Sequence, residues 1–193
     1  MSRPARVAGL ILAAGEGRRV GGPKQLAELH GRPLLEHAVG AMLGVPALSP
    51  VVVVLGAAAA EICAGVDLRG AEVVECPGWA EGQAASVRAG VQALGGVDAA
   101  LVTLGDQPLI TPQVIAAVLD AARGGDDAVR ATYDGRPGHP VLLSRALLDR
   151  VGELHGDVGF RDLLAGARVR GVECGRLGDP TDVDTPAALD ALR

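Results

Sequence analysis

Three almost entirely apolar runs constrain the fold of this chain more than any other feature of its sequence. They cover residues 7–13, 50–56 and 99–104, and none alternates as a strand with one solvent-exposed face does. Such runs are typical of strands at the centre of a parallel sheet that is buried on both faces. Helical patterns stand between them, so the order of elements predicts an α/β fold with a mostly parallel sheet.

The remaining elements follow from periodicity and from turn residues. Apolar positions recur every three or four residues after Pro33, over 57–64 and 83–94, and after Thr111, which is suited to cap a helix. We expect two strands of a hairpin-like insertion over 128–133 and 139–143, a helix over 159–165, a strand over 169–174 and a short helix after Thr185. These elements predict a three-layer, Rossmann-like fold, formed by a single domain over residues 1–193.

The composition excludes several classes of partner. With one Trp, one Tyr and one Phe in 193 residues, the core must consist of small aliphatic side chains. The chain lacks the aromatic platforms on which RRM and OB modules stack bases. A formal net charge of −5 argues against a general surface for nucleic acid or an anionic membrane. The first apolar run is too short to span a membrane, and its continuation into glycines and arginines fits a signal peptide poorly.

The cysteines indicate where the protein acts. Cys63, Cys76 and Cys174 are few and scattered, and no Cys-x-x-Cys pair occurs. This usage favours a reducing cytoplasm over a disulfide framework or a zinc knuckle. Cys63 and Cys174 lie in apolar patterns, so we expect both to be core thiols.

The loop over residues 15–24 is the strongest functional signal. Its glycines let the backbone approach a ligand and point N–H groups at oxyanions. Arg18, Arg19 and Lys24 add positive charge within a few residues. A solvated Gly-rich turn is the simpler alternative, but the position after the first strand of an α/β fold favours a phosphate site.

The two best-known phosphate-binding loops are both absent. Gly17 and Gly22 have the glycine spacing of a P-loop, but Pro23 stands where that loop requires Lys. Gly15 and Gly17 fit the start of the dinucleotide fingerprint, but Val20 occupies its third glycine position. A different kind of phosphate-binding loop remains.

Two acidic segments are candidates for a metal site. Asp106 lies in the turn Gly105-Asp-Gln-Pro108 directly after a strand, where it can hold a divalent cation or merely cap a helix. Asp182 and Asp184 alternate along an extended segment and so face the same side. Either could join Asp106 around Mg²⁺, or both could simply favour the dipole of the following helix.

Taken in order, the segments LAAGxGxR, GPK, GDQP and DVDTP resemble the MobA-like nucleotidyltransferase superfamily, and more narrowly the molybdenum cofactor cytidylyltransferases. Residues 81–90, 138–140 and 156–159 are also similar to family motifs, so the resemblance covers nearly the whole chain. It implies a nucleotidyltransferase fold and Mg²⁺-dependent transfer of CMP from CTP to the phosphate of molybdopterin, with release of pyrophosphate. It also implies transient contact with a molybdoenzyme or its chaperone.

The resemblance implies roles for the phosphate and metal residues. The loop from Gly15 to Gly22 would wrap the triphosphate, and Arg19 and Lys24 would neutralise it. Asp106 would bind Mg²⁺, with Asp184 or Asp182 as the second carboxylate. Arg19, Lys24 and Asp106 are therefore the expected catalytic residues.

The resemblance also assigns the base and acceptor sites. Ser86 and the pair Ala13-Ala14 would lie near the base, and the guanylyl-transferring branch tends to have Gly where Ala14 stands, which favours CTP. The full nucleotide site implied comprises Leu12, Ala13, Ala14, Gly15, Gly17, Arg18, Arg19, Lys24, Gly82, Ser86 and Gly105. His139 and Asp157 would line the acceptor pocket, although His139 could equally be a turn residue at the start of a strand.

Two other functions remain open. Residues 77–82 and 131–139 are similar to segments of nicotine blue oxidoreductase, so an NAD(P)H-dependent oxidoreductase on the same framework is the main alternative. The missing dinucleotide fingerprint and the retained carboxylates argue against it. A non-catalytic chaperone for a molybdoenzyme is a third possibility, against which the intact Arg19, Lys24 and Asp106 speak.

Overall fold

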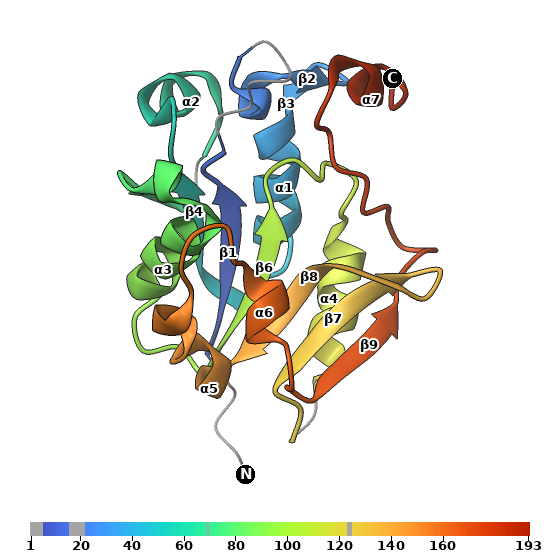
Figure 1. Cartoon of the computed structure of the whole chain (residues 1–193). Coiled ribbons are helices and arrows are strands. Elements are labelled where there is room, and N and C mark those ends of the chain that lie inside the picture. The colour runs from blue at the N-terminus through green and yellow to red at the C-terminus, as the bar shows by residue number, and fades with distance from the viewer. Residues whose placement is uncertain (1–5, 16–21, 69, 123–124) are drawn as a thin grey trace.

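The computed structural model describes residues 6–15, 22–68, 70–122 and 125–193 (Figure 1). Its centre is a seven-stranded sheet in the order β5-β4-β1-β6-β8-β7-β9. All neighbouring strands pair in parallel except at β8, which is antiparallel to both β6 and β7. The mostly parallel sheet expected from the sequence is therefore confirmed. The strands are β1 (Val7–Ala13), β4 (Leu48–Leu55), β5 (Glu72–Glu75), β6 (Ala99–Leu104), β7 (Ala128–Tyr133), β8 (Arg136–Ser144) and β9 (Val169–Glu173).

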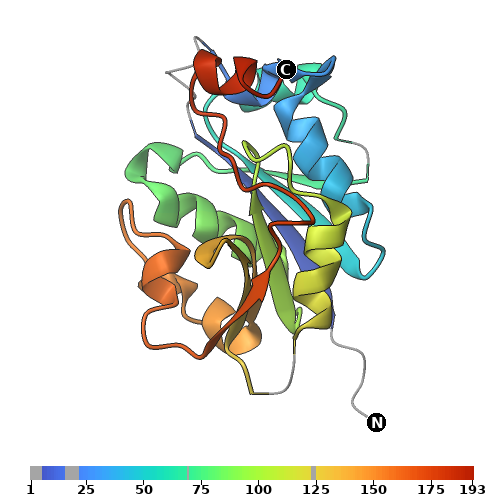
Figure 2. The same cartoon turned by 90° about the vertical axis from the view of Figure 1, so that its right-hand side faces the viewer.

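Helices cover both faces of this sheet, as Figure 2 shows edge-on. One face carries α1 (Leu34–Leu43), α2 (Ala59–Gly65) and α4 (Pro112–Asp120). The other carries α3 (Gln83–Ala93), α5 (Arg145–Leu148) and α6 (Phe160–Leu163). A short ribbon of β2 (Glu28–Leu29) and β3 (Arg32–Pro33) packs with α7 (Pro186–Asp190) through a small apolar cluster. The three-layer α/β architecture is as predicted.

The core is built from small aliphatic side chains because the layers lie close together. Along β1, Leu10 and Leu12 point to the α3 face, whereas Ile11 and Ala13 point to the α1 face. A Cβ atom added at Gly90 of α3 would lie 2.6 Å from Cδ1 of Leu10. Real Cβ atoms do not come this close, so a side chain at this position would force Leu10 or Val54 to shift, and Gly90 lets α3 pack on β1 without such a shift.

Local signals place several elements where the sequence predicts them. Thr111 and Thr185 cap α4 and α7 by accepting hydrogen bonds from the amides of Val114 and Ala188, at 3.3 and 3.1 Å. The β7–β8 hairpin also forms, but its turn is only Asp134-Gly135, both with positive φ, and β8 begins three residues earlier than expected. A two-residue turn of this kind matches the twist of a hairpin.

Two further sequence expectations have different outcomes. Cys174 is buried as expected, whereas Cys63 lies on the exposed side of α2, so its prediction as a core thiol is wrong.

In the described part of the chain, no helix has both the length and the apolar character needed to cross a membrane.

Candidate functional site

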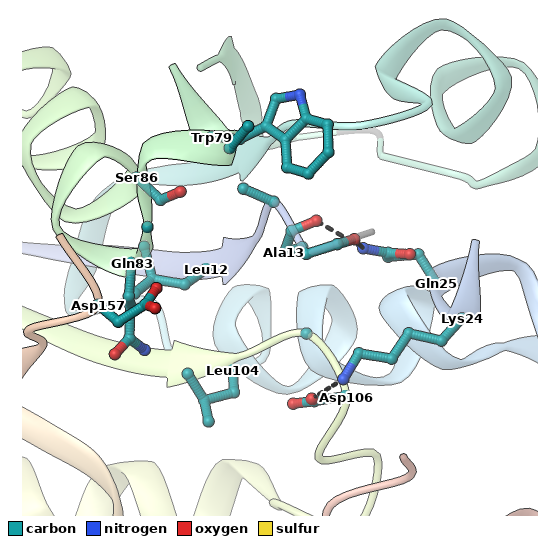
Figure 3. Close-up of a pocket in the computed structure, with 15 residues that line it drawn as sticks. Leu12, Ala13, Lys24, Gln25, Trp79, Gln83, Ser86, Leu104, Asp106 and Asp157 are labelled. Atoms are coloured by element: carbon teal, nitrogen blue, oxygen red, sulfur yellow. Dashed lines mark hydrogen bonds and ion pairs between the residues drawn. The ribbon is translucent and has the colours of Figure 1, made fainter. Parts of the chain in front are cut away.

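A pocket of about 400 Å³ opens at the carboxyl ends of β1 and β6. From β1 the chain crosses to β4, on one side of β1, whereas β6 lies on the opposite side of β1. Ligands of open α/β sheets bind where the strand order reverses in this way. The structure brings together ten residues that the sequence assigned to the site. They are Leu12, Ala13, Ala14, Gly15, Lys24, Gly82, Ser86, Gly105, Asp106 and Asp157 (Figure 3). Gly17, Arg18 and Arg19 lie outside the described residues, so their roles stay predictions.

Lys24 lies at the centre of the charged part of the pocket. Its ammonium donates to a carboxylate oxygen of Asp106 and, at 2.8 Å, to Oδ1 of Asp184. Burial alone disfavours the ammonium, but the two carboxylates outweigh it and raise the pKa of Lys24. Lys24 is the only lysine of the chain, and it remains charged at all physiological pH values.

Asp106 has the free coordination that a metal ligand needs. One oxygen pairs with Lys24, while the other, Oδ1, is buried and has no hydrogen-bond partner among the described residues. The backbone carbonyl of Asp106 accepts a hydrogen bond of 2.9 Å from the amide of Val183, which fixes the carboxyl-terminal acidic segment beside the turn. Asp106 and Asp184 therefore form a pair of hard oxygen donors around one cation, which suits Mg²⁺.

Asp182 and Asp184 have different partners. Asp182 accepts a hydrogen bond of 2.9 Å from the Gln107 side-chain amide, which also donates to the carbonyl of Pro180 at 3.1 Å. Burial and the nearby charge of Asp106 raise the pKa of Asp182. Of these two acids, Asp184 shares a cation with Asp106, whereas Asp182 is held by Gln107.

No cluster of three His, Cys, Asp or Glu side chains suited to a metal occurs in the described ranges. Two carboxylates alone leave most positions of an octahedral Mg²⁺ to other oxygen ligands. Mg²⁺ commonly keeps several waters and binds through one or two carboxylates together with substrate phosphates. The donor set thus fits a metal that arrives with a nucleotide.

Gln25 also lines the pocket, and the sequence does not predict this position as part of the site. Its buried amide donates to the carbonyls of Ala13 and Gly15, at 2.6 and 3.1 Å. These bonds hold the chain where it leaves β1, at Ala13 and Gly15. Trp79, Ala80, Gln83 and Leu104 also line the pocket without having been predicted. A glutamine that bonds to backbone carries no pattern that could have revealed it.

Gly82 joins this pocket to the loop before α6. It has a φ of +113°, and a Cβ atom added there would lie 2.4 Å from the Gly156 carbonyl. The same carbonyl accepts a hydrogen bond of 3.1 Å from Ala84 at the start of α3. The loop residue Asp157 therefore lies against the pocket, on the side away from Lys24 and Asp106 (Figure 3).

Replacing Gly82 by Ala is expected to lower the free energy of unfolding by roughly 1–3 kcal/mol, because the methyl group collides with backbone and the φ is unfavourable. Chemical denaturation measures this change. Gly152→Ala is the matched control, since a Cβ there meets nothing within 4 Å. Equal stability of the two variants would show that the 156–159 loop simply moves aside.

His139 lies outside the pocket that contains Lys24 and Asp106, in the wall of an adjoining cavity. Its carbonyl accepts a hydrogen bond of 2.7 Å from the hydroxyl of Tyr133. Burial and the charge of Arg130 lower the pKa of His139 to about 4. The imidazole is therefore neutral at pH 7.

This shift predicts a dependence of stability on pH. The ordinary pKa of 6.5 applies in the unfolded chain, so below this pH the unfolded chain takes up a proton that folded His139 does not. The stability that His139 contributes is thus complete above pH 6.5 and is lost as the pH falls towards 4. Denaturation at pH 7.5 and 5.0 should show a smaller loss for His139→Gln than for the wild type. His155→Gln, at an exposed position, is the control, and an equal loss in all three proteins would contradict the assignment.

Comparisons with known proteins show the family to which the chain belongs. The family described as the MobA-like NTP transferase domain matches residues 9–172. Nicotine blue oxidoreductase of Paenarthrobacter nicotinovorans is 35% identical over 93% of this chain and 92% of its own length. The 2-C-methyl-D-erythritol 4-phosphate cytidylyltransferase of Streptomyces avermitilis is 40% identical over 66% of this chain, which spans 56% of that enzyme.

A solved structure extends the likeness to the whole fold. The Rv0371c protein of Mycobacterium tuberculosis H37Rv, in complex with manganese, has a TM-score of 0.80 and 26% identity. The alignment covers 97% of each chain.

Proposed function

The chain belongs to the MobA-like NTP transferase family, and on this premise we propose that it transfers CMP from CTP to the phosphate of molybdopterin and releases pyrophosphate. The observation that carries the proposal is the position of Lys24, Asp106 and Asp184 around one point at the carboxyl ends of β1 and β6. A charged cluster there is suited to a triphosphate and its cation.

The residues of the chain chiefly position and neutralise charge. Nucleotidyl transfer is an in-line displacement at the α-phosphorus, in which the acceptor phosphate forms the new P–O bond as the bond to pyrophosphate breaks. Lys24 would hold phosphate oxygens, and the backbone of Gly15 would approach them closely. Arg19 would add a second positive charge. The acceptor supplies the nucleophile, so no activated Ser or Cys is needed.

A divalent cation fits this site and would be held by Asp106 and Asp184. When bound, it neutralises phosphate charge and stabilises the leaving pyrophosphate. The manganese complex of the Rv0371c protein supports divalent-metal dependence, and Mg²⁺ is the ion we propose here.

The pocket walls support a pyrimidine nucleotide. Ala13, Ala14 and Ser86 line the pocket together with Trp79. Ala14 favours CTP over GTP, and the cytidylyltransferase relative supports the same choice. The chain offers few rings for stacking, so backbone groups and small side chains would recognise the base.

The test uses the single tryptophan of the chain as a reporter. Trp79 fluorescence is titrated with CTP, GTP and ATP in the presence of Mg²⁺, and pyrophosphate release is then followed with molybdopterin as acceptor. CTP is expected to bind most tightly and to be the best substrate. No pyrophosphate release with any of the three nucleotides would overturn the transferase proposal, and a preference for GTP would overturn the role of Ala14.

The second candidate is an NAD(P)H-dependent oxidoreductase. It is favoured by the 35% identity to nicotine blue oxidoreductase, which extends over nearly the whole of both chains. The absent dinucleotide fingerprint and the Lys24–Asp106–Asp184 cluster count against it. NAD(P)H oxidation with a quinoid acceptor, together with no pyrophosphate release, would establish this candidate instead.

A further inference from the structure

Arg130 is a partly buried cation that the proposed transfer does not use. It lies on β7 opposite Val141 of β8, and its guanidinium faces the cavity beside α6. Its Nε atom is buried without a hydrogen-bond partner, and in the described ranges its side chain forms no ion pair. Burial lowers the pKa of Arg130, with no carboxylate to offset the effect. A buried guanidinium N–H without an acceptor is costly, and an anion bound at the Nε side would relieve that cost.

The cavity beside Arg130 is large enough for a small molecule. Its volume is about 510 Å³, and its walls include His139 and Phe160. Gln83 and Asp157 line both this cavity and the nucleotide pocket, so the two spaces adjoin. A molecule in the cavity can therefore reach the end of a nucleotide in the pocket.

The cavity wall carries two acids and two arginines, and of these four side chains Arg130 is the one that is partly buried. Asp157 and Asp162 line it but are exposed, and neither forms an ion pair with Arg130. Arg161 is exposed and adds a second positive charge at the same cavity. The neutral His139 ring can donate or accept a hydrogen bond without changing the charge. Arg130 therefore provides the least hydrated positive charge there, in a planar fork suited to carboxylate or phosphate.

His139 and Asp157, which the resemblance implies for the acceptor pocket, both line this cavity. We propose that Arg130 binds an anionic oxygen group of the acceptor there, so that it determines acceptor specificity. The triphosphate is held by other residues, namely Lys24 and its neighbours. This inference rests on the proposed function in taking the guest to be the acceptor. The anion contact itself follows from Arg130 and the cavity alone.

The first experiment tests anion binding without any reaction. In ¹⁵N-labelled wild-type protein, the Nε–Hε signal of Arg130 is assigned by its loss in Arg130→Lys. Titration with inorganic phosphate is expected to shift this signal to saturation. The signal of Arg170, which pairs with Asp126 at 2.7 Å on the outer strand β9, should stay in place. An Arg130 signal that does not move, or that moves only together with Arg170, would overturn the proposal.

The second experiment separates the acceptor from the nucleotide. Arg130→Gln is expected to raise the KM for molybdopterin about 10- to 100-fold, the loss expected of a hydrogen bond to a charged group. The KM for CTP should stay within about twofold. Guanidinium ion in the buffer should restore part of the acceptor affinity, an effect that a merely structural role would not produce. Equal rises in both KM values without rescue would overturn the proposal.

The two experiments also distinguish this inference from the proposed function. If the wild type releases no pyrophosphate but phosphate still shifts the Arg130 signal, the transferase reaction fails and the anion site stands. If pyrophosphate is released but the Arg130 signal and the acceptor KM do not respond, the anion site fails alone.

Discussion

Asp106→Asn is expected to lower the rate of nucleotidyl transfer roughly 10²- to 10³-fold, the size of effect seen when one preorganised electrostatic contact is removed. The amide keeps the shape of the carboxylate but loses its charge, and with it the site for a divalent cation. The bond from the Val183 amide goes to the backbone of residue 106, so the turn should stay in place. Pyrophosphate release at saturating CTP and Mg²⁺ measures the effect.

The control for this variant is Asp149→Asn, at an exposed carboxylate that pairs with Arg145 on the surface of the molecule. Such a pair contributes little to stability, and this variant should retain wild-type turnover. Circular dichroism and denaturation curves verify that both variants fold. Near wild-type turnover in Asp106→Asn would mean that Asp106 does not hold the metal.

Lys24→Met has the second large expected effect. It should lower the rate of nucleotidyl transfer but raise the affinity for a divalent metal ion. Without the Lys24 ammonium, the triphosphate loses one of its contacts with the protein. The rate of nucleotidyl transfer should therefore fall by an amount similar to that of Asp106→Asn. However, the Lys24 ammonium contacts both Asp106 and Asp184, at the point where a metal cation held by these two carboxylates would sit. Removing this internal cation should tighten binding of Mn²⁺ alone roughly tenfold.

Titration of free Mn²⁺ by electron paramagnetic resonance measures that affinity without any turnover. Lys24→Arg keeps the positive charge and should bind Mn²⁺ as weakly as the wild type. Because Lys24 is the only lysine, [¹³C]lysine labelling gives one ε-methylene signal that should shift when the metal binds. Unchanged Mn²⁺ affinity in Lys24→Met would show that lysine and metal do not compete.

The sequence predicts the parts of this molecule that depend on local pattern. The apolar runs identify β1, β4 and β6 because a strand buried on both faces has no polar alternation. Lys24 and Asp106 are expected to lie close together because each follows a parallel strand, and the carboxyl ends of these strands meet at one edge of the sheet. The turn of the β7–β8 hairpin is shorter than the predicted turn over residues 134–138, because Pro137 and Gly138, which usually indicate a turn, belong to strand β8.

The parts that could not be predicted depend on packing between distant segments. Gln25 donates hydrogen bonds to backbone carbonyls. No sequence pattern distinguishes a polar residue with this role from one that faces solvent. Arg130 stands in the alternating strand β7, where a charged residue usually indicates a solvent-facing side. Only the placement of α6 over that face shows that its guanidinium borders a cavity. Cys63 is the opposite case, a residue predicted to be buried that is exposed. Its apolar neighbours belong to the buried side of α2, whereas its own side chain does not.

The contact between Lys24 and Asp184 also bears on the order in which the chain folds. It joins positions 160 residues apart, and the Val183–Asp106 bond closes a second long loop beside it. Contacts of such separation form only after most of the chain is ordered, because loop closure must precede them. A growing chain can therefore bring the Asp184 carboxylate to Lys24 only after residue 184 has been synthesised and the sheet that positions Lys24 and Asp106 has formed.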